Sequence, residues 1–113
     1  MKPIARSEEI NVLSFSECHD GKGTLLCRSL LDGSDSGKFC LMHSDDIPAG
    51  VSIGEHTHDE NEEIYYLLSG KGVLTFDGVE YPINPGDISL CGQGHSHGFL
   101  ATENCVLIVV GSR

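Results

Sequence analysis

Basic side chains are scarce in this sequence of 113 residues, which has 7 lysines and arginines against 17 aspartates and glutamates. The formal net charge at pH 7 is −10. A surface of that sign repels the phosphates of nucleic acids and the headgroups of anionic membranes. We therefore expect neither nucleic acid nor membrane as a partner. A small anionic ligand is still allowed, because a bound metal ion dominates the field within its own site.

Long apolar segments are also missing. The longest apolar run, Cys105 to Val110, has the length of a strand and falls far short of the roughly 20 residues of a membrane helix. Residues 1–9 contain no apolar segment of the kind that a secretory signal needs. The five cysteines are odd in number and include no CxxC pair, which argues against a disulfide framework. Reduced thiols and a cytoplasmic location are the expectation.

No segment shows a helical period, and short apolar runs separated by turn residues fill the chain. Strands are expected over residues 10–15, 24–31, 38–43, 51–58, 63–68, 73–76, 79–83, 88–91, 99–101 and 105–110. Asp77-Gly78 is typical of a type I′ hairpin turn, and Pro82 favours an edge strand or a bulge. This pattern predicts a single-domain, all-β sandwich or barrel.

The segment from Gly50 to Gly70 carries the chemistry. His56 and His58 are two residues apart, so on a strand both imidazoles project from the same face. Glu63 begins the next apolar run after a polar turn, and His97 arrives later in a glycine-rich loop. Three imidazoles and one carboxylate suit a divalent first-row metal ion.

These residues resemble the first motif of the cupin superfamily, G-x5-H-x-H-x(3,4)-E-x6-G. The matching positions are Gly50, His56, His58, Glu63 and Gly70. The second motif, G-x5-P-x-G-x2-H-x3-N, is matched by Gly86, Gly94 and His97, whereas Gly92 replaces its proline and Ala101 its asparagine. Neither departure removes a metal ligand.

The resemblance implies a cupin jelly-roll barrel with one divalent metal ion, Mn, Fe, Ni or Zn, held by His56, His58, Glu63 and His97. Residues 21–113 would form the barrel and residues 1–20 an N-terminal strand or arm. Family members of this size commonly pair through that strand, so the resemblance also implies a homodimer.

Three residues are candidates for catalytic roles beside the metal. Tyr65 shares strand parity with Glu63 and would line the cavity or belong to the core. His95 lies two residues before His97, either facing the pocket or in a loop. Arg28 could clamp a substrate carboxylate, or it could be a solvated charge on its strand. Of the remaining histidines, His43 could face the pocket, and His19 is expected to be a loop residue.

Three functions are compatible with the resemblance. The leading expectation is a metal-dependent enzyme, an oxygenase, isomerase or decarboxylase/lyase, acting on a small organic acid or sugar derivative. The alternative is a non-catalytic protein that binds a small carboxylate or sugar at its metal. A third possibility is a structural cupin whose role is dimerisation, which a cavity plugged by Tyr65, Phe76 or Phe99 would support. The motifs predict fold and metal but not the reaction, because one fold supports many chemistries.

Overall fold

The computed structural model describes residues 3–113, which fold into ten strands and two short 3-10 helices. The helices are η1 (Ser7–Glu9) and η2 (Cys18–Asp20). The strands are β1 (Asn11–Ser16), β2 (Thr24–Leu31), β3 (Phe39–Ile47), β4 (Ser52–Thr57), β5 (Glu63–Ser69), β6 (Gly72–Phe76), β7 (Val79–Ile83), β8 (Ile88–Cys91), β9 (Ser96–Ala101) and β10 (Cys105–Ser112). Within this range, neither helix has the length or apolar character needed to cross a bilayer.

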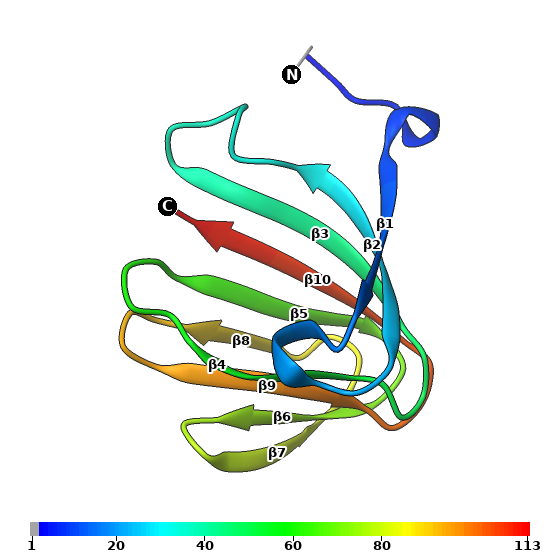
Figure 1. Ribbon diagram of the computed structural model, residues 1–113, viewed down its shortest axis with the longest axis vertical. Coiled ribbons are helices and arrows are strands. Elements are labelled where there is room, and N and C mark those ends of the chain that lie inside the picture. The colour runs from blue at the N-terminus through cyan, green and yellow to red at the C-terminus, as the bar shows by residue number, and fades with distance from the viewer. Residues whose placement is uncertain (1–2) are drawn as a thin grey trace.

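The strands form two antiparallel sheets that face each other across the core (Figure 1). One sheet has the order β1-β2-β3-β10-β5-β8, and the other has the order β4-β9-β6-β7. Strands distant in sequence pair in both sheets, as in β3 with β10 and β4 with β9. This is the jelly-roll arrangement that the sequence predicts.

Most of the expected strands and turns are confirmed, and two boundaries are wrong. The strand expected over residues 99–101 begins at Ser96, because pairing with β4 and β6 places His97 in the sheet instead of in the glycine-rich loop. Asp77 and Gly78 both have positive φ, 48° and 78°, as a type I′ turn requires. Pro82 lies on β7, which is an edge strand. The strand expected to end at His43 continues to Ile47, because Ser44, Asp45 and Asp46 pair with both β2 and β10 despite their polarity, and Ile47 pairs with β10.

Alternate residues of the central strands fill the space between the sheets. In β10, Leu107 and Val109 are buried, and in β5, Tyr65 and Leu67 are buried. Phe99 on β9, in the other sheet, is buried in the same hydrophobic cluster. The five cysteines are all free, as expected for reduced thiols.

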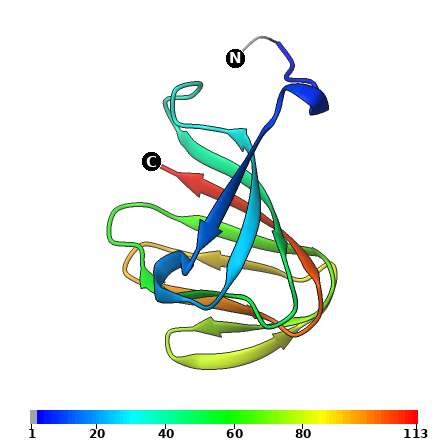
Figure 2. The same cartoon turned by 45° about the vertical axis from the view of Figure 1, so that its right-hand side comes forward.

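The segment around η2 lies directly on the backbone of β4. Gly54 allows this approach, since a Cβ there would overlap the carbonyl oxygen of His19. Gly21 makes the reciprocal contact, because a Cβ at that position would overlap the carbonyl oxygen of Ser52. Figure 2 shows the turn of η2 against the barrel at the end of β1. Two glycines therefore place His19 beside the end of the barrel where β4 carries its histidines.

Strand β1 is the edge of the larger sheet and belongs to the predicted N-terminal arm. It pairs with β2 along its whole length, and all six of its residues are exposed. Figures 1 and 2 show it running from η2 toward the N-terminus, away from the closed part of the barrel. The division between arm and barrel at residue 20, and the use of the arm in dimerisation, stay predictions.

Candidate metal centre

Strands β4 and β9 bring three histidines to one end of the smaller sheet. His56 and His97 are directly opposite each other in the antiparallel pairing of these strands. His58 lies just beyond β4, where its backbone N–H donates to the carbonyl of His95 (3.1 Å) and its carbonyl accepts from the N–H of Gly94 (2.6 Å). The glycine-rich loop before β9 thus holds His58 in place through its backbone.

Glu63 reaches the histidines from the other sheet. It is the first residue of β5 and pairs with Cys91 on β8 and Gly111 on β10. Its side chain is buried, with 8% of the residue exposed. The four side chains are therefore assembled only when the two sheets face each other.

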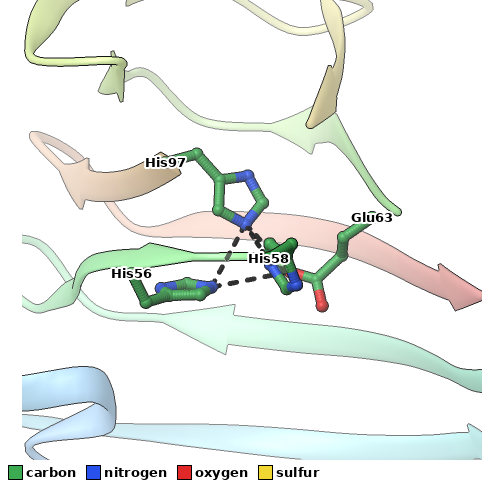
Figure 3. A group of neighbouring side chains, drawn as sticks. All are labelled: His56, His58, Glu63 and His97. Carbon is green, nitrogen blue, oxygen red and sulfur yellow. Dashed lines mark hydrogen bonds and ion pairs between the residues drawn. The ribbon is translucent and has the colours of Figure 1, made fainter. Parts of the chain in front are cut away.

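The donor atoms of the four residues converge on one point (Figure 3). The Nε2 atom of His97 lies 3.0 Å from Nε2 of His58, 3.2 Å from Nε2 of His56 and 3.1 Å from Oε1 of Glu63. All four donor atoms lie within 4.8 Å of one another. Four close donors, of which three are imidazole nitrogens, are the arrangement in which a transition-metal ion is bound.

Hydrogen bonds on the far side of two rings prepare them as ligands. Nδ1 of His56 lies 2.8 Å from the carbonyl oxygen of Gly54, and Nδ1 of His58 lies 3.0 Å from Oδ1 of Asn61. Both acceptors call for a proton on Nδ1, which leaves the Nε2 lone pair free to bind a metal ion. The third ring, His97, has a buried Nδ1 with no hydrogen-bond partner among the described residues.

The protonation states of Glu63 and His97 also fit metal binding. Burial alone would raise the pKa of Glu63, but hydrogen bonds from His56 and His97 outweigh it and lower the pKa to about 2. Burial lowers the pKa of His97, which favours the neutral ring. A metal ion needs an ionised carboxylate and neutral imidazoles, and Glu63 and His97 meet this need. At His56, burial alone would lower the pKa, but hydrogen bonds with Glu63 and the Gly54 carbonyl outweigh it and raise the pKa, so a metal ion would displace a proton from that ring. The residues present therefore fit the divalent metal ion that the sequence predicts.

Two aromatic rings stack on histidines of the candidate metal centre. Tyr65, which is 2% exposed, stacks on His97 with ring centroids 4.0 Å apart. His19 stacks on His56 at 3.7 Å. His19 was expected to be only a loop residue, and its spacing from the motifs carries no signal of this contact. Its place depends on the close packing of η2 on Gly54.

The other two catalytic candidates lie apart from the four donors. Nδ1 of His95 is 2.6 Å from Oδ2 of Asp77, and its ring stacks on Phe76 at the surface. Arg28 donates from Nη2 to Oγ of Ser7 (3.3 Å). Neither residue lines the cavity beside Glu63. Their catalytic roles stay predictions, and the geometry adds no support to them.

A cavity of about 230 Å³ opens beside Glu63 and Tyr65. His43 and Asp45 on β3 line it, together with His19. Burial raises the pKa of Asp45 to about 6, and the hydrogen bond with the Cys27 thiol only partly opposes this. His43 faces the pocket, one of the two orientations that its position allowed. Sequence reasoning missed Asp45 as a polar residue of the site, because the strand was expected to end at His43 and Asp45 was expected to lie outside it.

Comparisons with known proteins agree with this geometry. The cupin domain family model matches residues 44–111. The chain is 35% identical to an oxalate-binding protein of Thermotoga maritima over 102 residues, which are 89% of this chain and 84% of that protein. A crystal structure of a predicted oxalate decarboxylase from Thermotoga maritima superposes with a TM-score of 0.85 at 34% identity, covering 96% of each chain.

A third relative is matched over a shorter segment. The quercetin 2,3-dioxygenase of Bacillus subtilis is 37% identical over 51 residues, which are 45% of this chain and 15% of that enzyme. So short a match adds to the family assignment and says nothing about the whole enzyme's activity. On the family model, the similarity to the Thermotoga maritima protein and the site of three histidines and one glutamate, the chain belongs to the cupin family and is a metal-binding member of it.

Proposed function

We propose that this protein binds a small organic acid through a divalent metal ion held by His56, His58, Glu63 and His97. The observation that carries the proposal is the convergence of these four donors beside a cavity of about 230 Å³. Four protein ligands leave one or two positions open on a five- or six-coordinate ion, and a carboxylate can occupy them. When bound, the metal ion supplies Lewis acidity at those positions.

The size of the cavity limits the ligand to a small metabolite. Drug-sized ligands occupy pockets of roughly 300 to 1,000 Å³, so this space suits an acid of few carbon atoms. The relative named as an oxalate-binding protein supports the same class of ligand. Within this proposal, Tyr65 positions the ring of His97 through their stacking contact and forms one wall of the cavity.

Oxalate is the probe that tests the proposal. We expect isothermal titration calorimetry to detect one oxalate site on protein loaded with one equivalent of Mn²⁺ and none on the metal-free protein, because the carboxylates bind through the ion. Replacing Mn²⁺ with Zn²⁺ in a parallel titration shows whether binding depends on the metal. Equal oxalate affinity with and without metal would contradict the proposal.

A metal-dependent enzyme is the second candidate, and the titratable cavity residues favour it. His19, His43 and Asp45 line the space beside Glu63 although none of them is among the four convergent donors. Such groups can hold or transfer a proton at a bound acid. Analysis of products after the titration separates this candidate from simple binding, since an enzyme consumes the acid and a binding protein returns it unchanged.

We also propose that the protein forms a homodimer through β1. The free edge of this strand can pair with the same strand of a second copy, and Val12 and Leu13 there are 54% and 44% exposed. We expect size-exclusion chromatography with light scattering to give a dimer for the wild type and a monomer for Val12→Lys, because a lysine on an edge strand opposes pairing. Val79→Lys, on the β7 edge of the other sheet, is the control and should stay dimeric. A wild-type monomer would contradict the proposal.

A further inference from the structure

The cavity beside the metal centre has a polar end that the four convergent donors do not use. His43 on β3, Val109 on β10 and Tyr65 on β5 lie in one row across the larger sheet. Asp45 is two residues further along β3, so it points to the same face as His43. It lies in the next row of inward-facing residues, beside the row that contains Tyr65. The remainder of the lining is largely apolar. The cavity therefore extends from the glutamate of the metal centre to the carboxylate of Asp45.

The carboxylate of Asp45 is incompletely satisfied. The residue is 5% exposed, and its Oδ1 atom has no hydrogen-bond partner among the described residues. Nδ1 of His43 lies 4.0 Å from that oxygen, which is too far for a hydrogen bond. Within residues 3–113, no lysine or arginine lines this cavity. A buried carboxylate oxygen in this position is stabilised by any group that donates a hydrogen bond to it.

We propose that Asp45, with His43 beside it, is a second recognition point that selects acids carrying a hydroxyl or ammonium group at the end opposite the metal-bound carboxylate. This inference rests on the proposed function, because the metal centre must hold the first carboxylate. A hydroxyl or ammonium donates to Oδ1 of Asp45. A second carboxylate in its place meets an acceptor of like charge. The preferred ligand is thus a hydroxy acid or amino acid of three or four carbons rather than a dicarboxylate that fills the cavity.

A metal ion is the other occupant that the polar end of the cavity, at His43 and Asp45, could bind. One donor atom from each of Cys27, His43 and Asp45 lies within 4.8 Å of the others. Against it, the thiol of Cys27 is fully buried, and burial raises its pKa to about 12, so that a metal ion would have to displace a firmly held proton. Cys27 also does not line the cavity, whereas His43 and Asp45 do. A donor group of the ligand is therefore favoured, and a second metal ion becomes an outcome of the test.

Protein loaded with one equivalent of Co²⁺ provides the readout, because the visible spectrum of the bound ion changes when an acid binds to it. The probes are matched three-carbon acids: propionate, malonate, 3-hydroxypropionate and 3-aminopropionate, with the corresponding four-carbon series in parallel. We expect the hydroxy or amino acid of one series to bind at least about tenfold more tightly than the diacid of equal length, which corresponds to one hydrogen bond to a charged group. Equal affinity of donor acids and diacids in both series would overturn the inference.

Two variants test whether Asp45 is the cause. Asp45→Leu should reduce the preference for the donor acids to less than about threefold, since the acceptor is gone. Asp45→Asn retains the shape and an acceptor but removes the charge, so the penalty on the diacid should fall even if the leucine variant folds poorly. Asp46→Asn is the matched control, because Asp46 is exposed and points to the other face of β3. A preference that survives both substitutions at Asp45 would overturn the inference.

The same samples separate the remaining outcomes. If no acid in either series, nor oxalate, changes the cobalt spectrum, the proposed function itself fails. If oxalate binds and the matched acids show no preference, only this inference fails. A second equivalent of Co²⁺ that produces a sulfur-to-cobalt charge-transfer band, lost in Cys27→Ser, would show that Asp45 holds a metal ion and would overturn it as well.

Discussion

His58→Ala should abolish stoichiometric metal binding while leaving the barrel folded. The ring supplies one of the four donors, and its Nε2 lies 3.0 Å from that of His97 and 3.5 Å from Oε1 of Glu63. Replacing even an outer partner of a metal ligand weakens binding about 10- to 100-fold, so loss of a ligand should have at least that effect. His58 is only partly buried and lies just beyond the end of β4, so its removal leaves the core intact.

Elemental analysis of protein purified without chelator and without an affinity tag is the measurement. We expect about one equivalent of a divalent transition metal in the wild type and a small residual fraction in the variant. His95→Ala is the matched control, since His95 lies in the neighbouring loop and contacts Asp77 instead of the four donors. Sub-stoichiometric mixed metals in the wild type, unchanged in His58→Ala, would show that the four residues do not form the site. The metal found would also narrow the chemistry, with Fe favouring oxygen activation and Zn favouring redox-neutral Lewis-acid chemistry.

Gly54→Ala should cause the largest loss of stability of any single added methyl group near the site. A Cβ at position 54 would overlap the carbonyl oxygen of His19, so η2 and β4 must move apart. Overpacking of this kind costs about 1 to 3 kcal/mol, and the contact here is with backbone, which places the expected loss at about 3 kcal/mol. For a domain of this size, that corresponds to a fall in Tm of about 10 °C.

Thermal unfolding by circular dichroism measures this effect, and the metal centre should respond with it. The carbonyl of Gly54 accepts from Nδ1 of His56, and the ring of His19 stacks on His56, so both contacts are disturbed together. Gly37→Ala is the control, because no atom lies within 4 Å of a Cβ at that position. A Tm for Gly54→Ala within about 2 °C of the control would mean that η2 does not lie against β4 as described.

Much of the barrel could be predicted from local sequence because each strand is short, apolar and bounded by turn residues. Asp77-Gly78 specifies its hairpin through the positive φ of both residues, and no distant contact is needed. One exception is the first half of β9, which was expected to be part of a glycine-rich loop and is held in the sheet by β4 and β6. The other exception is the second half of β3. Its sequence, Ser44-Asp45-Asp46-Ile47, has the polarity of a loop, and only pairing with β2 and β10 keeps it in the sheet. Local pattern cannot reveal this, because strand pairing depends on residues more than 15 positions away in the chain.

The metal ligands could also be predicted from local sequence patterns. Strand parity predicts that His56 and His58 lie on one face, although β4 ends at Thr57 and His58 lies just beyond it. The motif spacing adds Glu63 and His97 to them. Sequence alone therefore determined the all-β class, the cupin family and the four residues that could hold the metal ion.

The tertiary structure decided which further residues meet that centre. His19 reaches His56 because two glycines allow η2 to lie on β4, and Asp45 reaches the cavity because β3 is longer than its composition suggests. Conversely, His95 is two residues from a ligand and still pairs with Asp77 at the surface. Periodicity specifies the face of a strand on which a side chain lies. The neighbours across the barrel follow from packing between the two sheets, which no local spacing encodes.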